Sequence, residues 1–308
     1  MEKSATATAH GNLYHVEPHP QHARIQRVIL SDDAIGEIVD VCSKHNVLNL
    51  EYTPFARLVL AGQISEQLGE PFVQLLRQIL HDRATGGLTL GLQGRSDDTG
   101  LFVIFATAIV HLIGLPNFDA MTGKYYARFV VQHEDKSDSY LRKAYRKLYL
   151  HTDGTYVNEV TDWLLMMKMA ERNARGGRSR VLHLDDWEDL KRYSQHPLAT
   201  HPFTYKAPPS KNVNAEVKRQ TFFSDDEGRP CLCFIDQFVY PETREQGAWL
   251  NEMLNSMEAS PATRPISLPV GEFVMLNNRF WAHGREAFEP DPGLYRELMR
   301  LRGYFAET

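Results

Sequence analysis

The segment 150–154, Leu-His-Thr-Asp-Gly, places an imidazole and a carboxylate two residues apart. On an extended chain, residues i and i+2 point to the same face, so the side chains of His151 and Asp153 converge from one strand end. Gly154 allows the backbone to turn directly afterwards. A second histidine, His283, is followed by a glycine and flanked by aromatic residues at another predicted strand end. These residues are the strongest candidates for chemistry in the chain.

Two histidines and one carboxylate that leave three coordination positions open are the facial triad of non-haem Fe(II) oxygenases. The open positions can take a bidentate 2-oxo acid and O₂. A zinc hydrolase also uses histidine and aspartate ligands. A histidine two residues from an aspartate is, moreover, common in surface hydrogen-bonded pairs. The ligand types alone therefore leave these alternatives open.

A run of arginines near the C-terminus supplies a second clue. On a predicted strand over 296–304, Arg296, Leu298, Arg300 and Arg302 share one face. Guanidinium groups on an inward face require anions, because a buried unpaired charge costs several kcal/mol. Arginine pairs bidentately with carboxylates. The pattern predicts a site for the distal carboxylate of a dicarboxylic acid, and a solvated edge strand with a basic face is the alternative.

Composition excludes several classes of protein. The 308 residues carry 34 Lys and Arg against 39 Asp and Glu, and 43% of them are hydrophobic. This balance is not typical of a disordered chain or of a nucleic-acid-binding surface. Three cysteines are too few for a disulfide framework. The longest apolar run, 101–115, is shorter than the roughly 20 residues that a membrane span needs. We expect a cytoplasmic protein that binds neither nucleic acid nor membrane.

The elements that must position these residues follow from hydrophobic periodicity. Residues 1–24 are predicted to be a flexible leader, and 25–308 a single domain with a helical N-terminal part. Predicted helices cover 31–42, 66–81, 97–114, 185–193 and 245–258. Short predicted strands cover 126–131, 148–151, 163–169, 180–184, 230–238, 266–268, 272–276 and 296–304. The order indicates one α+β domain built on a mainly β sandwich or barrel.

Other conspicuous residues have simpler interpretations. His111 lies on an apolar predicted helix and is interpreted as a hydrogen-bonded core residue. His183 alternates with apolar neighbours, which favours a structural role. Cys231 and Cys233 share a strand face, but no second pair completes a zinc site.

Several motifs together resemble a known enzyme group. His151-x-Asp153, the segment 176–179, His283 and Arg296-x-x-x-Arg300 resemble the Fe(II)/2-oxoglutarate-dependent dioxygenases of the taurine dioxygenase and clavaminate synthase-like group. More specifically, the chain resembles the CsiD family of glutarate 2-hydroxylases from about residue 50 onward. The runs that carry this resemblance are 110–114, 117–121, 125–131, 137–142, 151–157, 182–188, 207–213, 235–239 and 296–306.

The resemblance implies a double-stranded β-helix, or jelly-roll, core with flanking helices. It implies that His151, Asp153 and His283 bind Fe(II). Arg296 would hold the distal carboxylate of 2-oxoglutarate, assisted by Ser179. In the implied reaction, O₂ and 2-oxoglutarate are converted to succinate and CO₂ while a C–H bond of a small aliphatic carboxylic acid is hydroxylated. The resemblance also suggests a homo-oligomer, either a dimer or a tetramer.

The candidate substrate residues are less sharply defined. Arg300 is a candidate for either 2-oxoglutarate or the substrate. The remaining candidates for the substrate are Arg302, Tyr125, Tyr140, Asn158 and Glu159.

Three functions follow as hypotheses. Hydroxylation of glutarate to 2-hydroxyglutarate is the leading one. The chain departs from the family pattern at Thr152, Asn158, Arg279 and Ala282, which favours considering hydroxylation of a free amino acid such as L-lysine as the alternative. A non-catalytic jelly roll that binds dicarboxylates is a second alternative, although both metal-ligand motifs are intact.

Overall fold

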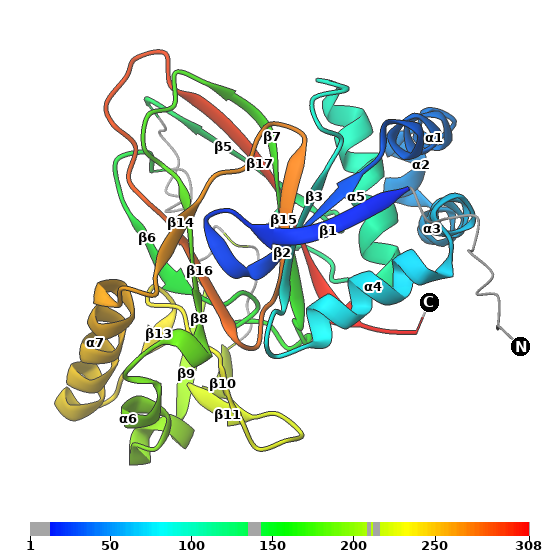
Figure 1. Ribbon diagram of the computed structural model, residues 1–308. Coiled ribbons are helices and arrows are strands. Elements are labelled where there is room, and N and C mark those ends of the chain that lie inside the picture. Colours follow the sequence, from blue (N-terminus) through cyan, green and yellow to red (C-terminus); the bar gives the residue numbers. More distant parts are fainter. Residues whose placement is uncertain (1–12, 135–142, 208–210, 212–215, 308) are drawn as a thin grey trace, which may run out of the picture.

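The structure is a computed structural model that describes residues 13–134, 143–207, 211 and 216–307. A helical layer covers one face of a large sheet, and a smaller sheet lies beyond its other face (Figure 1). The α-helices are α1 Asp32–Ser43, α2 Val47–Tyr52, α3 Pro54–Leu68, α4 Glu70–His81, α5 Thr99–Ile113, α6 Leu190–Ser194 and α7 Arg244–Ala259. Short 3₁₀ turns cover Leu184–Asp186 and Pro197–Thr200.

Two sheets form the β body. The large sheet has the order β1 (Tyr14–His19), β2 (His22–Leu30), β3 (Gly87–Gly91), β15 (Glu272–Asn277), β7 (Trp163–Arg172), β17 (Tyr295–Phe305) and β4 (Gly114–Pro116), with β5 (Ala127–Gln132) also on β17. The smaller sheet has the order β14 (Arg264–Ile266), β8 (Ser179–His183), β16 (Trp281–Arg285) and β6 (Leu148–His151). Except for β2 beside β3, neighbouring strands are antiparallel.

An additional β region follows the smaller sheet in the chain. It contains β9 Pro202–Lys206, β10 Glu216–Gln220, β11 Phe222–Ser224, β12 Pro230–Leu232 and β13 Val239–Tyr240. In Figure 1 this region lies next to α6 and α7.

The chain passes back and forth between the two sheets. β5, β7, β15 and β17 belong to the large sheet, while the intervening β6, β8, β14 and β16 belong to the smaller one. Only the step from β8 to β14 stays within one sheet. This order brings the ends of β6 and β16 and one face of β17 to the space between the sheets.

Local sequence signals explain most helix boundaries. Ser31 caps α1 by accepting a hydrogen bond from the Ala34 N–H, and Thr243 forms a capping box at the start of α7. The helices predicted over 31–42, 97–114 and 245–258 match α1, α5 and α7 closely. α5 is apolar on every side because it lies between the large sheet and the other N-terminal helices.

Two helix predictions need correction. The helix predicted over 66–81 is in fact two helices, because Gly69 takes a positive φ of 81° and ends α3 before α4 begins. The helix predicted over 185–193 is a 3₁₀ turn followed by the short α6. His183 Nδ1 accepts a hydrogen bond from the Asp185 N–H, and Arg83 binds the Asp185 carboxylate at 2.5 Å. These contacts hold the segment in a turn.

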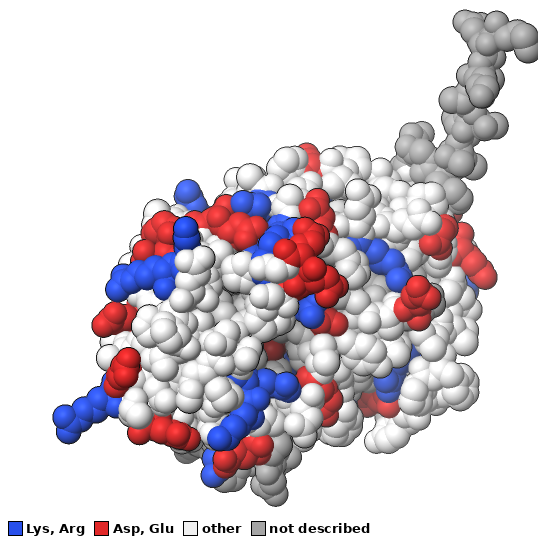
Figure 2. All heavy atoms as spheres, turned by 90° about the horizontal axis from the view of Figure 1, so that it is seen from below, with Lys and Arg blue, Asp and Glu red and all other residues white. Residues whose placement is uncertain are grey.

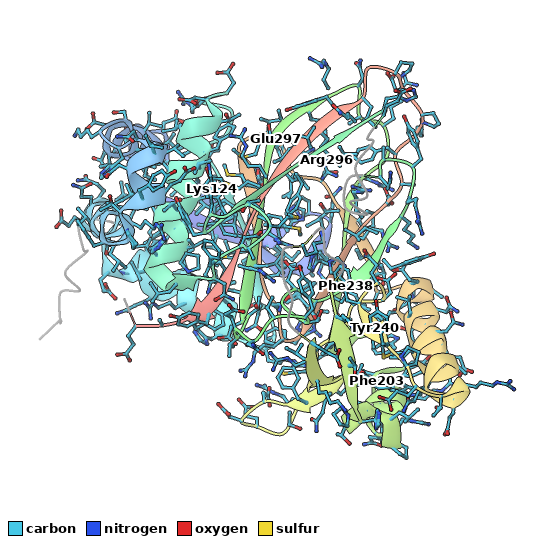
Figure 3. The ribbon with its side chains drawn as sticks, turned by 180° about the vertical axis from the view of Figure 1, so that it is seen from behind. Lys124, Phe203, Phe238, Tyr240, Arg296 and Glu297 are labelled. Atoms are coloured by element: carbon cyan, nitrogen blue, oxygen red, sulfur yellow. The ribbon has the colours of Figure 1, made fainter. Side chains whose placement is uncertain are left out.

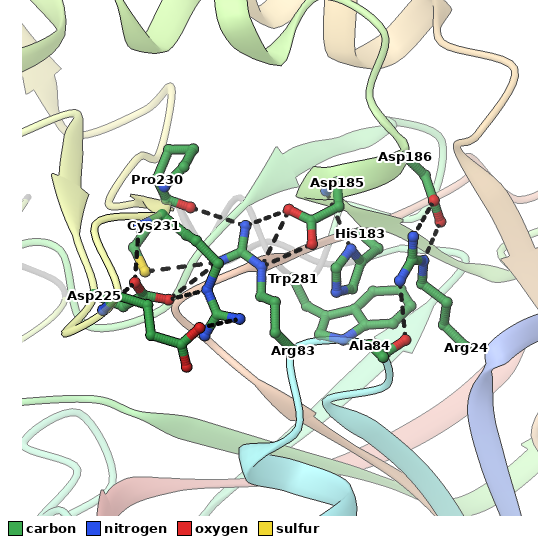
Figure 4. A network of polar contacts seen from close by, with 12 residues as sticks. Arg24, Arg83, Ala84, His183, Asp185, Asp186, Asp225, Pro230, Cys231 and Trp281 are labelled. Carbon is green, nitrogen blue, oxygen red and sulfur yellow. Dashed lines mark hydrogen bonds and ion pairs between the residues drawn. The ribbon is translucent and has the colours of Figure 1, made fainter.

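The polar contacts around this turn join distant parts of the chain (Figure 4). Arg83, which follows α4, also donates to the Pro230 carbonyl at 3.0 Å. Arg24, on β2, forms an ion pair with Asp186 at 2.7 Å. The network therefore fixes the helical layer and β2 against the smaller sheet. This supports the structural role predicted for His183.

The flexible leader predicted for residues 1–24 is wrong over residues 14–24. β1 and β2 form an antiparallel hairpin on the edge of the large sheet, and Ile25 is fully buried. The hairpin was missed because its polar residues and Pro18 are typical of an edge strand rather than a core strand. Residues 1–12 lie outside the described residues.

Surface charge and hydropathy agree with the composition. On the face shown in Figure 2, basic and acidic side chains are interspersed. Among the described helices, none combines the length and the apolar character that crossing a membrane requires.

Because His111 and His183 are buried, we expect the protein to lose stability in mild acid. Burial lowers the pKa of His111 and of His183 from 6.5 to about 4. Because the unfolded chain then binds protons more readily than the folded one, this stability is complete above about pH 6.5 and is lost as the pH falls toward 4. We expect the melting temperature to decrease between pH 7 and pH 4.5.

The variant His111→Phe tests this cause directly. It removes one titrating group, so its unfolding free energy should have a pH slope smaller by about one proton in this range. An unchanged slope would mean that His111 does not contribute.

Candidate active site

The two predicted histidine ligands lie opposite each other on neighbouring strands. His151 ends β6, and His283 pairs with it from β16 in the smaller sheet. Directly paired residues point to the same face of a sheet. Their rings accordingly face the same space, with centroids 4.2 Å apart. His151 and His283 are 132 residues apart in sequence (283 − 151). They are adjacent in the fold because β6 and β16 are hydrogen-bonded neighbours.

Asp153 joins the histidines from the turn that follows β6. Its Oδ1 lies 4.0 Å from His151 Nε2. Gly154 has a positive φ of 77°, and a side chain there would collide with Thr161. The glycine is therefore required for the turn, as the sequence predicts. Ligand atoms from His151, Asp153 and His283 all lie within 4.8 Å of one another.

Protonation states in this cluster suit metal binding. His151 Nδ1 lies 2.7 Å from the Tyr149 carbonyl oxygen, which can only accept a hydrogen bond. Nδ1 therefore carries the proton, and the Nε2 lone pair is available. Burial lowers the pKa of His283 to about 3, so this imidazole is neutral. Its buried Nδ1 has no hydrogen-bond partner among the described residues.

The carboxylate ligand is held ionised by an arginine. Burial acts to raise the pKa of Asp153, but nearby positive charges, with Arg300 foremost, outweigh it and hold the pKa well below its ordinary value. Arg300 Nη1 lies 3.2 Å from Asp153 Oδ2. Its Nη2 donates to Asp119 Oδ2 at 2.8 Å. Arg300 thus bridges two carboxylates of the chain itself.

The predicted arginine face is present on β17. Met299 and Leu301 pack into the helix-side core, while Arg296, Arg300 and Arg302 are on the opposite face. This face looks into the space between the sheets. The alternative of a solvated edge strand is wrong, because β17 is paired on both sides and these arginines are largely buried.

Arg296 and Ser179 meet across the two sheets. Arg296 Nη2 lies 3.4 Å from Ser179 Oγ, and Nη1 donates to the Gly177 carbonyl at 2.5 Å. Arg296 and its neighbour Glu297 are labelled on β17 in Figure 3. Both Arg296 and Ser179 line a cavity of about 450 Å³. Arg296 Nε is buried without a hydrogen-bond partner in the described part of the chain.

Arg302 is a buried arginine whose guanidinium is only partly hydrogen-bonded by the described residues. Its side chain is 6% exposed, and Nε and Nη1 lack hydrogen-bond partners among the described residues. The hydroxyl of Tyr156 is close by: burial raises its pKa, and the charges of Arg302 and Arg300 oppose that rise. Such a guanidinium needs an anionic ligand to offset its desolvation.

The structure does not bring every predicted substrate residue to this site. The Tyr125 hydroxyl is engaged with Thr107 in the helical layer at 2.8 Å. Asn158 and Glu159 are exposed, and Glu159 lines a cavity of about 370 Å³ that Asp153 also lines. The contact with Thr107 places Tyr125 away from the cluster, whereas Asn158 and Glu159 stay predictions. Tyr140 lies outside the described residues.

Four residues near the cluster were missed by sequence reasoning. Asp119 binds Arg300. The charges of Arg302 and Arg300 act to lower the pKa of Tyr156. Asn278 holds the backbone of Asp153 at 2.8 Å. Burial raises the pKa of Asp236, with neighbouring His151 opposing that rise. Asp119, Tyr156 and Asp236 lie in runs that resemble the family, and this is the one signal that the sequence gives for them.

The fold resembles that of solved non-haem iron oxygenases. A crystal structure of asparagine oxygenase matches with a TM-score of 0.72 and 15% identity over 90% of this chain and 92% of that one. The same kind of enzyme in complex with Fe(II), hydroxyasparagine and succinate matches with a TM-score of 0.69 and 16% identity over 89% and 92% of the two chains. These similarities define the class of fold, a mixed α/β fold with a large antiparallel sheet.

A further solved structure has the same fold. The non-haem iron oxygenase OrfP in complex with Fe and α-ketoglutaric acid matches with a TM-score of 0.65 and 15% identity over 89% of this chain and 92% of that one. The CsiD family model matches residues 14–305, and the chain belongs to the CsiD family. The resemblance found in the sequence is thereby confirmed, and it extends further toward the N-terminus than the motifs indicated.

Proposed function

We propose that this protein is an Fe(II)- and 2-oxoglutarate-dependent hydroxylase of a small aliphatic carboxylic acid, with glutarate as the leading substrate. The observation that carries the proposal is the convergence of the His151, Asp153 and His283 cluster with the β17 arginines in one buried space. The eight strands that alternate between the sheets would form the jelly-roll core. The non-catalytic alternative is disfavoured because all three ligands are present together.

The donor set fits Fe(II). Two imidazoles and one ionised carboxylate supply three ligands on one side. The buried Nδ1 of His283 has no hydrogen-bond partner among the described residues, so a polar group there is left for a ligand to satisfy. Bound there, Fe(II) would supply the oxidative chemistry that couples decarboxylation of 2-oxoglutarate to C–H hydroxylation. The protein's own residues would orient both acids and exclude water. In sum, 2-oxoglutarate, O₂ and R–H give succinate, CO₂ and R–OH.

Arg296 and Ser179 are the proposed site for the distal carboxylate of 2-oxoglutarate. Burial lowers the pKa of Arg296 to about 10, so the guanidinium remains charged at neutral pH. Its Nε lies 3.6 Å from Glu171 Oε2, beyond hydrogen-bond distance, so it can donate to an incoming carboxylate, and Ser179 can supply a hydroxyl.

Replacing Arg296 by alanine is expected to weaken the binding of 2-oxoglutarate specifically. Loss of a charge-assisted hydrogen bond worth about 1.5–3 kcal/mol corresponds to a KM for 2-oxoglutarate raised roughly 10- to 100-fold. The KM for the primary substrate should change much less. The measurement is succinate formation at varied 2-oxoglutarate, and an unchanged KM would remove Arg296 from this role.

Charge favours a carboxylate as the primary substrate. Arg300 is occupied by Asp119 and Asp153, so we assign it to holding the metal ligand rather than to binding a ligand directly. Arg302 is left to bind the substrate carboxylate, with Tyr156 as a neighbouring hydroxyl. A carboxylate bound there would meet the two nitrogens of Arg302 that lack hydrogen-bond partners among the described residues.

Departures from the family pattern do not contradict glutarate. The Thr152 hydroxyl accepts a hydrogen bond from the Phe234 N–H at 3.0 Å, so it is used in the scaffold. Ala282 pairs with Leu182 and points away from the face that carries His283. Asn158 is exposed. None of these side chains has a described contact with the cluster.

One observation favours the amino-acid alternative. Asp236 is a half-buried carboxyl group beside His151, and the contact described for it is a 3.5 Å approach by Gln237. A carboxylate at this position could receive the ammonium group of a substrate such as L-lysine. The solved relatives in fold include structures whose titles name hydroxylated asparagine and arginine.

Substrate-dependent succinate formation distinguishes the two cases. The enzyme is loaded with Fe(II) under anaerobic conditions, then exposed to O₂ with 2-oxoglutarate and either glutarate or L-lysine. We expect glutarate to stimulate succinate formation and Asp236→Asn to leave that stimulation largely intact. Stimulation by lysine that is lost in Asp236→Asn would support the alternative instead. No stimulation by either acid, despite bound iron, would reject both substrates.

A further inference from the structure

We propose that Asn278 is a positioning residue that sets the place of the carboxylate metal ligand. The inference rests on the proposed function, because it takes Asp153 as a ligand of Fe(II). Asn278 lies in the turn between β15 and β16, far from Asp153 in sequence, and its side chain is 4% exposed.

The side-chain amide of Asn278 forms hydrogen bonds with both the N–H and the carbonyl of Asp153. Its Oδ1 accepts a hydrogen bond from the Asp153 N–H at 2.8 Å, and its Nδ2 donates to the Asp153 carbonyl at 2.9 Å. Nδ2 also donates to the Thr161 carbonyl at 2.8 Å. The side chain therefore replaces a neighbouring strand at the point where β6 has ended, and it fixes the turn that Gly154 makes possible.

The same residue links the two halves of the metal cluster. Asn278 precedes His283 by five residues (283 − 278), in the turn that leads from β15 in the large sheet to β16 in the smaller one. Its backbone N–H donates to the Asp162 carbonyl at 2.7 Å, beyond the Asp153 turn. The loop that carries Asp153 and the strand that carries His283 are thus held in a fixed relation. A ligand held by a turn alone would lack that support.

The preceding residue provides a matched control. Asn277 is equally buried, with 4% exposure, and its side chain also makes hydrogen bonds to the backbone. Its Nδ2 donates to the Leu80 carbonyl at 3.0 Å, and its Oδ1 accepts from the Arg279 N–H at 3.0 Å. Neither contact involves a ligand of the cluster. Truncating either asparagine removes buried hydrogen bonds, but only Asn278 contacts Asp153.

Metal affinity is the test, measured on the full-length protein. Fe(II) binding is determined by anaerobic equilibrium dialysis, and Mn(II) binding by electron paramagnetic resonance, for wild type, Asn278→Ala and Asn277→Ala. We expect Asn278→Ala to weaken metal binding roughly 10- to 100-fold, the usual effect of losing a residue that orients a ligand. Asn277→Ala should lower the melting temperature to a similar extent while metal affinity stays within about 3-fold of wild type.

A second variant tests whether misfolding alone explains weaker metal binding. Asn278→Asp keeps the size of the side chain and the acceptor for the Asp153 N–H, but it cannot donate to the two carbonyls when ionised. It should fold and still show weakened metal binding. Wild-type affinity in a folded Asn278 variant, or equal loss in Asn277→Ala, would overturn the positioning role. Failure of the wild-type protein to bind Fe(II) would instead reject the proposed function.

Discussion

Asp153→Ala is expected to abolish 2-oxoglutarate-dependent turnover. Two imidazoles alone would remain as ligands, and Arg300 would lose one of its two carboxylate partners beside the vacated position. Metal catalysis contributes several kcal/mol, so the loss should be at least roughly 10³-fold in kcat. Succinate formation is the measurement, with anaerobic Fe(II) binding determined in parallel to show that metal affinity is lost as well.

A nearby carboxylate serves as the control for Asp153→Ala. Asp162 lies 3.5 Å from Arg279 and accepts a hydrogen bond from the Phe305 N–H, and it is not among the clustered ligands. Asp162→Ala should retain most of the activity. If Asp153→Ala kept more than a tenth of wild-type turnover, Asp153 could not be the carboxylate ligand.

Arg302→Leu should show opposite effects on activity and on stability. Without the guanidinium, the substrate carboxylate loses a charge-assisted interaction of about 1.5–3 kcal/mol, which raises the substrate KM roughly 10- to 100-fold. The free enzyme, however, no longer buries a guanidinium with two nitrogens that lack hydrogen-bond partners among the described residues. Replacing buried charge by an apolar side chain is often stabilising by about 1–4 kcal/mol. The melting temperature should therefore increase.

Measuring both quantities separates a ligand-binding role from a structural one. Steady-state kinetics with varied primary substrate give KM, and thermal unfolding gives stability. Arg180 offers a comparison, because it is equally buried but bound to Glu258 at 2.7 Å. Arg180→Leu should destabilise the protein, because Glu258 loses one of the two cations that pair with it and keeps only Lys147. A lower melting temperature and an unchanged KM for Arg302→Leu would show that Arg302 serves the fold alone.

The metal cluster could be predicted because its signals are local. Alternation places His151 and Asp153 on one side of an extended segment, and the same alternation aligns the β17 arginines. Family-like motifs then identify His283 as the third ligand. The structure adds the reason that these pieces meet: β6 and β16 are paired strands, and β17 faces them from the other sheet.

The sequence does not predict which carboxylates pair with which arginines inside the site. Nothing in the sequence shows that Arg300 pairs with Asp119, while Nε and Nη1 of Arg302 lack hydrogen-bond partners among the described residues. The difference depends on Asp119, which lies 181 residues before Arg300 in the sequence (300 − 119). For the same reason Asn278, which acts on a turn formed by distant residues, carries no local signal of its contact with Asp153.

The edge of the fold was the least predictable part. β1 and β2 have polar, histidine-rich sequences, and their strand conformation comes from pairing with each other and with β3. Tyr125 was similarly misleading. It was a candidate for binding the substrate, but its hydroxyl is engaged with Thr107 on α5. In both cases tertiary packing determined the outcome.

Oxygen-isotope transfer distinguishes 2-oxoglutarate-dependent hydroxylation from other chemistry. The Fe(II)-loaded enzyme is supplied with ¹⁸O₂, 2-oxoglutarate and glutarate, and the products are analysed by mass spectrometry. We expect one ¹⁸O atom in succinate and ¹⁸O in the hydroxylated product, with CO₂ released in equal amount to succinate. Products whose new oxygen comes only from water, or product formation that does not require O₂ and 2-oxoglutarate, would contradict it.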